Sequence, residues 1–174
     1  MLGALLLGGC SDPQQPPSMG GAPAPSEARR LAESSDAAIT QPPAWVAAAH
    51  PSELLECYVD VVEGAERTPG GWQVAAHTAL LSGWSVKLDQ KQQPPALLLL
   101  QGPNTYVFKA VRSQRDDVTQ AEQFRVIAPA DPGVAVPLWL EGVVPGTYRM
   151  SLVVGEAAEA LRCDLGEANQ LLVR

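Results

Sequence analysis

Hydrophobic and polar residues alternate along most of the chain from residue 55 onward, and this period of two constrains the fold more than any other feature. Successive side chains of a β-strand point to opposite faces, so the pattern predicts half-buried strands. Gly- and Pro-rich turn signals separate the segments, and no long amphipathic helix interrupts them. We therefore expect an all-β fold, an antiparallel β-sandwich of about seven or eight strands. The expected strands cover residues 55–62, 78–88, 96–101, 105–111, 134–141, 148–154, 160–163 and 169–173, with 72–76 as a short edge strand.

The first 52 residues differ in composition from the rest of the chain. Seven of the 16 prolines lie between Pro13 and Pro43, and large apolar residues are few there. Such a segment buries too little surface to offset the entropy lost on ordering. We expect residues 11–52 to form a mostly disordered tether and residues 53–174 to form a single sandwich domain.

An apolar run at the start of the chain ends in Leu7-Gly-Gly-Cys10, and Ser11 follows. A leucine three residues before a cysteine, with two small residues between them, resembles the lipobox of bacterial lipoproteins. The resemblance implies that residues 1–10 are a signal-peptide remnant and that Cys10 is acylated. It also implies a membrane-anchored protein on the periplasmic face of the cell envelope, with the outer membrane favoured over the inner. The alternative is an ordinary apolar N-terminus with a chance cysteine.

No Lys or Arg precedes Cys10, although signal peptides begin with a basic region. We therefore expect the basic part of the signal to be encoded upstream of Met1.

Two further cysteines, Cys57 and Cys163, lie near opposite ends of the expected domain. Each alternates in phase with apolar neighbours, so both should point into the core. Disulfides persist in oxidising compartments such as the bacterial periplasm, and we expect these two residues to be bonded. The alternative is two buried free thiols, which pack as small apolar groups.

The charge of the expected domain limits its partners. Residues 53–174 contain 15 acidic and 10 basic residues, and no basic run occurs among them. Nucleic acids and anionic lipid head groups are bound by clustered Lys and Arg, so the composition argues against both.

Few residues suggest catalysis. His50 and His77 are the only histidines, too few for a metal site, and we expect neither a metal nor another cofactor. Arg115-Asp116-Asp117, with Arg112 shortly before it, is a candidate for a site with perturbed carboxylates. Surface ion pairs, with Asp117 as a helix cap, are the simpler interpretation. Because no nucleophile, base and oxyanion donor come together, we predict that the protein is not an enzyme.

Tryptophans provide two candidate contact residues. Trp139 is out of phase with its inward-pointing neighbours, and Trp72 lies on the expected edge strand, so both should face outward. Exposed Trp side chains often contact proteins or sugars. Coverage by a loop or by the edge of the other sheet is the competing interpretation. Trp84, which shares a face with Leu80 and Val86, is assigned to the core.

Three short motifs resemble an immunoglobulin-like accessory domain. They are Leu81-Ser-Gly-Trp84, Arg115-Asp-Asp-Val118 and the turn Pro145-Gly-Thr-Tyr148. Domains of this kind occur in bacterial envelope proteins, including the tails of membrane-bound glycan-assembly proteins. The resemblance covers about residues 55–174, and its motifs are short.

Together these features predict a non-catalytic lipoprotein whose sandwich binds an envelope protein or a surface glycan. One alternative is a periplasmic enzyme or regulatory subunit that uses residues 112–124. Another is an assembly lipoprotein of a secretion system or pilus.

Overall fold

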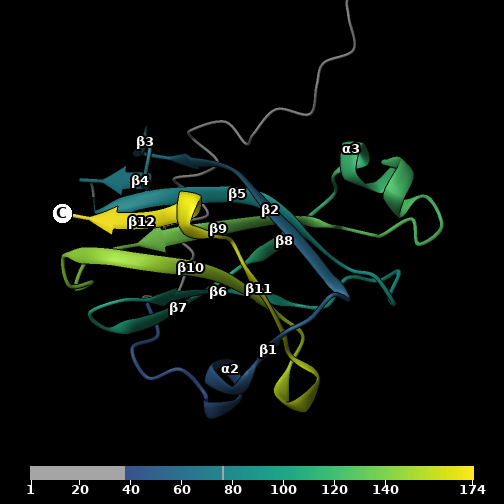
Figure 1. Cartoon of the computed structure of the whole chain (residues 1–174), viewed down its shortest axis with the longest axis horizontal. Helices are drawn as coiled ribbons and strands as arrows, with labels where there is room; N and C mark the ends of the chain where they lie inside the picture. The colour runs from purple at the N-terminus through teal and green to yellow at the C-terminus, as the bar shows by residue number, and fades with distance from the viewer. Residues whose placement is uncertain (1–37, 76) are drawn as a thin grey trace, which may run out of the picture.

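The computed structural model describes residues 38–75 and 77–174. This part of the chain is mostly β-structure, arranged as two sheets that pack face to face (Figure 1). Two parallel strand pairs interrupt an otherwise antiparallel pattern. The expected all-β sandwich is confirmed, with additional short strands.

One sheet has four antiparallel strands in the order β2-β5-β9-β8. Its β2 edge carries a bulge between Val59 and Val61, which leaves Asp60 without an opposite residue on β5. At the other edge β8 pairs with β9 only as far as Ala135, so Pro137 has no β8 residue opposite it. The strands are β2 (Leu55–Glu63), β5 (Thr78–Lys87), β9 (Gly133–Trp139) and β8 (Val111–Ser113).

The second sheet is built around β10. One edge of β10 pairs with β6, which continues to β7, and the other edge pairs with β11 and β12. β4 adds to β12 and β1 adds to β11, both in parallel, and β3 pairs with β4. The strands are β1 (His50–Pro51), β3 (Ala65–Thr68), β4 (Gly71–Val74), β6 (Ala96–Gln101), β7 (Thr105–Lys109), β10 (Gly146–Val154), β11 (Leu161–Asp164) and β12 (Gln170–Val173).

The last two expected strands, at residues 160–163 and 169–173, do not pair with each other as a hairpin. β11 pairs with residues 151–154 of β10, and β12 pairs with residues 146–148 of the same strand. The two segments follow one another along a single edge, interrupted by the 3-10 turn η3 (Glu167–Asn169). They therefore act as one broken strand.

The four strands β2-β5-β9-β8 of the first sheet face β6, β10 and the broken β11–β12 strand of the second. At the corner before β10, the hydroxyl of Tyr148 donates to the carbonyl of Val144 at 2.5 Å. Tyr106 accepts a bond from the Val144 N–H at 3.0 Å, so two tyrosines hold both polar groups of that residue.

The main core lies between the sheets, but β5 buries both of its faces. Leu81 joins the core between the sheets, whereas Trp84 and Val86 pack with Phe124 on the outer side. The assignment of Trp84 to the main core is therefore wrong. The segment after β8 covers the outer face of β5, so this strand carries apolar side chains on both faces. In such a strand the alternation does not indicate which face points inward.

The ordered domain begins before residue 53. Ile39 exchanges two backbone hydrogen bonds with Val107 on the edge strand β7. The short helix α2 (Ala44–Ala48) lies below β6 and β7 in Figure 1. Its residue Val46 packs against the outer face of the second sheet. Val46 is fully buried there. Several residues before position 53 therefore contact the sandwich, among them Ile39, Val46 and the strand β1, which pairs with β11.

Candidate functional site

The connection between β8 and β9 contains the charged residues that the sequence singles out. It forms the helix α3 (Asp116–Thr119) and a 3-10 turn, η1 (Glu122–Phe124). Val118 and Phe124 are buried, and they pack against Trp84 and Val86 of β5. The ring of Phe124 meets Trp84 edge-on at 5.5 Å. This apolar anchor holds the charged start of α3 beside β2.

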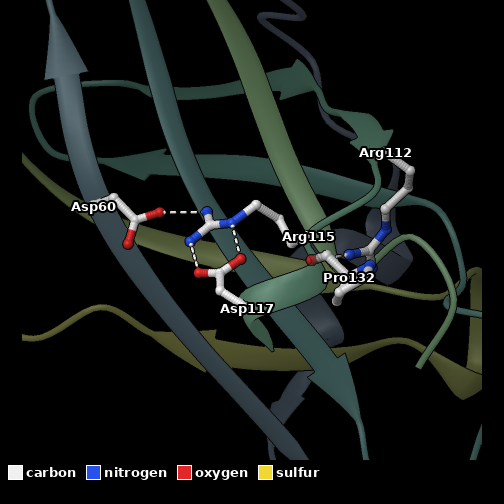
Figure 2. A network of polar contacts seen from close by, with 5 residues as sticks. All are labelled: Asp60, Arg112, Arg115, Asp117 and Pro132. Atoms are coloured by element: carbon white, nitrogen blue, oxygen red, sulfur yellow. Dashed lines mark hydrogen bonds and ion pairs between the residues drawn. The ribbon is translucent and has the colours of Figure 1, made fainter. Parts of the chain in front are cut away.

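Arg115 joins α3 to strand β2 (Figure 2). Its Nε donates to Asp117 Oδ1 at 2.8 Å and its Nη2 donates to Asp117 Oδ2 at 2.7 Å, a bidentate pair. Its Nη1 bonds Asp60 Oδ2 at 2.6 Å. The bulge that leaves Asp60 unpaired on β2 supplies the second carboxylate.

The electrostatics of this cluster favour the charged state of both partners. The hydrogen bonds from Arg115 lower the pKa of Asp117 below its usual value. Hydrogen bonding to Asp117 in turn raises the pKa of Arg115. A carboxylate held ionised by a bidentate guanidinium is a weak proton acceptor at neutral pH. The arrangement therefore suits a structural clamp better than acid–base chemistry.

Asp116 and Asp117 have different partners. Asp116 Oδ1 accepts a hydrogen bond from Gln114 Nε2 at 2.7 Å on the protein surface. The expected cap at Asp117 is wrong, because Arg115 occupies the cap position and no side-chain cap bond forms. The bidentate pair with Arg115 engages both oxygens of Asp117 instead.

Arg112 has different partners: its guanidinium reaches Pro132, whereas Arg115 binds Asp60 and Asp117, and we call these last three residues the Arg115 clamp (Figure 2). Its guanidinium donates to the backbone carbonyls of Pro94 at 2.8 Å, Ser85 at 3.1 Å and Pro132 at 3.3 Å. Burial lowers its pKa to about 10, and the charge of Asp131 opposes that shift. Arg112 thus joins β8 to β5 and two loops, and contributes no group to the Arg115 cluster.

Trp72 is buried, contrary to the expectation that it faces solvent. It is 9% exposed, because it lies on the same inward face of β4 as Val74 and belongs to the main core, and β4 lies between β3 and β12 and is not the expected edge strand. The guanidinium of Arg67 lies 4.4 Å from its ring centroid, a cation–π contact that covers the ring further. A surface contact through Trp72 is therefore not favoured.

Trp139 and Tyr58 differ in exposure. Trp139 is half-buried at the end of β9, opposite Thr78, so the expectation of an outward Trp is met only in part. Tyr58, which the sequence analysis did not single out, is 55% exposed on β2 and stacks on Trp84 at 6.4 Å. The alternation along β2 predicts that Tyr58 points outward. It does not identify Trp84 as the residue that lies beside it on the sheet.

Cys57 and Cys163 form the predicted disulfide. Their Cα atoms are 6.2 Å apart and their positions differ by 106 residues. The bond joins β2 of the first sheet to β11 of the second. Both residues are half-buried rather than central in the core.

Cys10 lies outside the described residues. Within residues 38–75 and 77–174, no group of three His, Cys, Asp or Glu side chains is arranged to hold a metal ion. No helix in the same part of the chain is long and apolar enough to cross a membrane.

No protein-family model matches the chain, and comparisons with curated proteins and with solved structures give no match. The site must be interpreted from its own geometry.

Proposed function

We propose that this chain is a non-catalytic lipoprotein of the bacterial cell envelope, anchored through Cys10. In this proposal the sandwich binds another envelope protein or a surface glycan on the periplasmic side of the membrane.

The Cys57–Cys163 disulfide is the observation that carries the proposal. Disulfides of this kind form in oxidising compartments and are rare in the reducing cytosol. A disulfide-bonded sandwich that follows a lipobox-like cysteine fits an exported, membrane-tethered module. Neither feature depends on the other, because one lies in the fold and the other in the N-terminal sequence.

The contacts of the charged cluster suit a structural role better than a catalytic one. Arg115 is occupied by two carboxylates and Arg112 by three carbonyls, so both guanidinium groups hold segments of the fold together. No described observation favours the alternative of an enzyme that uses residues 112–124.

Membrane fractionation tests the anchor. The gene is expressed with its native upstream codons, beside a Cys10→Ala variant, and membranes are separated on a density gradient. We expect the wild type in a membrane band and the variant in the soluble periplasmic fraction. A Ser11→Ala variant serves as the control and should stay membrane-bound. If wild type and Cys10→Ala distribute alike, the anchor is wrong, and cytosolic protein would contradict the compartment as well.

A further inference from the structure

The outward side of β2 presents an aromatic ring between carboxylates. Glu56, Tyr58 and Asp60 all point away from the core, because alternate residues of the strand face outward. Glu56 and Tyr58 are successive outward positions, which lie about 7 Å apart on a regular strand, and Asp60 follows at the bulge. We call Glu56, Tyr58 and Asp60 the Tyr58 surface.

Tyr58 is the most exposed aromatic residue in the described part of the chain, at 55%. Its ring stacks on Trp84 with an interplanar angle of 25°, and Phe124 supports Trp84 from the side. A ring held in this way loses little conformational freedom when a partner covers it. The surface is therefore preorganised for contact.

The charge around the ring is negative. Arg115 is the cation that bonds Asp60, and it also holds Asp117, so one positive charge serves two carboxylates. Glu56 is exposed and adds a further negative charge on the other side of Tyr58. Anionic ligands are disfavoured here, whereas a cation is attracted by both the ring face and the carboxylates.

We propose that the Tyr58 surface docks an arginine-bearing basic segment of a partner protein. The Arg guanidinium lies over the exposed face of Tyr58 and bonds Glu56 or Asp60. The chain makes the same type of contact internally, where Arg67 covers Trp72 at 4.4 Å. This inference rests on the proposed binding function and names the surface and the partner chemistry for it.

Calorimetry with the purified full chain tests the inference. The probe is an acetylated, amidated peptide of alternating Arg and Ala, compared with the same peptide carrying citrulline in place of Arg. We expect the Arg peptide to bind and the citrulline peptide not to bind. Tyr58→Ala should weaken binding of the Arg peptide by about three- to fivefold, and Tyr58→Phe should retain it. Glu56→Gln should weaken it by about twofold or more.

The matched control removes one exposed carboxylate elsewhere. Glu167→Gln on η3 changes the net charge by the same amount as Glu56→Gln, and should leave binding unchanged. Far-UV circular dichroism checks that each variant is folded. The inference is overturned by absent binding, by equal binding of the citrulline peptide, or by equal loss in Glu56→Gln and Glu167→Gln. It is also overturned if cellohexaose, and not the Arg peptide, binds in a Tyr58-dependent manner.

Peptide binding by the purified chain does not depend on acylation. Its failure therefore leaves the fractionation result intact, and a soluble protein in the fractionation experiment would leave the peptide result intact.

Discussion

Arg115 binds two carboxylates that come from different places in the sequence, Asp117 two residues away and Asp60 55 residues away. Asp117 is a local partner that the run Arg115-Asp116-Asp117 already contains. Asp60 is available because a bulge on β2 leaves it unpaired and turned outward. The clamp holds the segment after β8 to the edge of the sheet.

The lowered pKa of Asp117 predicts an acid-dependent loss of stability. Because the folded pKa lies below the unfolded value, the contribution is fully present above the unfolded pKa and is lost as the pH falls through the folded pKa. Asp117 is 63% exposed in its side chain, so solvent weakens the pair. Asp117→Asn should lower the free energy of unfolding at neutral pH by less than about 1 kcal/mol. Urea unfolding from about pH 6 to about pH 2 should show that difference vanish in acid.

Asp116→Asn is the control for this measurement, because Asp116 contacts Gln114 and not the Arg115 clamp. The difference in the free energy of unfolding between Asp116→Asn and wild type should change less with pH than the difference between Asp117→Asn and wild type. A constant gap between wild type and Asp117→Asn at all pH values would contradict the assigned role.

At the scale of elements, β2 is held to the rest of the molecule in three ways. Its backbone pairs with β5, Asp60 reaches Arg115, and Cys57 is bonded to Cys163 on β11. The disulfide joins β2 and β11, which lie in different sheets and share no backbone hydrogen bonds of a strand pair. β2 is an edge strand of nine residues, so its backbone pairs on one side only and the two side-chain contacts add to its attachment.

Removing the disulfide should cost substantial stability. A cross-link that closes a loop of about 100 residues stabilises by about 4–5 kcal/mol in the chain-entropy model. The double variant Cys57→Ala/Cys163→Ala should therefore unfold at a lower urea concentration, by a free energy of that size. Reduced wild type is the control and should match the variant. Two free thiols in unfolded, unreduced wild type would contradict the bond itself.

At the scale of the whole molecule, the segment before β2 belongs to the domain. Ile39 covers the edge strand β7, and Val46 seals the outer face formed by Leu99, Val107 and Val153. Without this segment those three side chains would be exposed, although the main core between the sheets would be intact.

Two truncations test where the domain begins. A chain that starts at Ala38 should unfold with the same free energy as the full chain. A chain that starts at Glu53 should be less stable by at least about 2 kcal/mol, since burial of one Val side chain alone contributes about 1.5–3 kcal/mol. The comparison is made by urea unfolding with the disulfide intact. Equal stability of the two truncated chains would place the boundary after residue 52.

The sequence by itself determined the strands and the sandwich, because alternation and turn residues act over a few neighbouring positions. The expected β6 matches the observed Ala96–Gln101, and the expected start of β5 at Thr78 is also correct. The pairing of Cys57 with Cys163 was predictable because both residues alternate in phase with core residues near the two ends of the domain.

Only the tertiary structure decided what covers each surface. Trp72 is buried because its face of β4 packs into the core between the sheets, and Trp84 on the outer face of β5 is covered because Phe124 returns over it. Asp60 binds Arg115 because the segment after β8 returns to the edge of β2. These contacts join residues far apart in the chain, and short-range periodicity carries no information about which distant segment comes back to a given face.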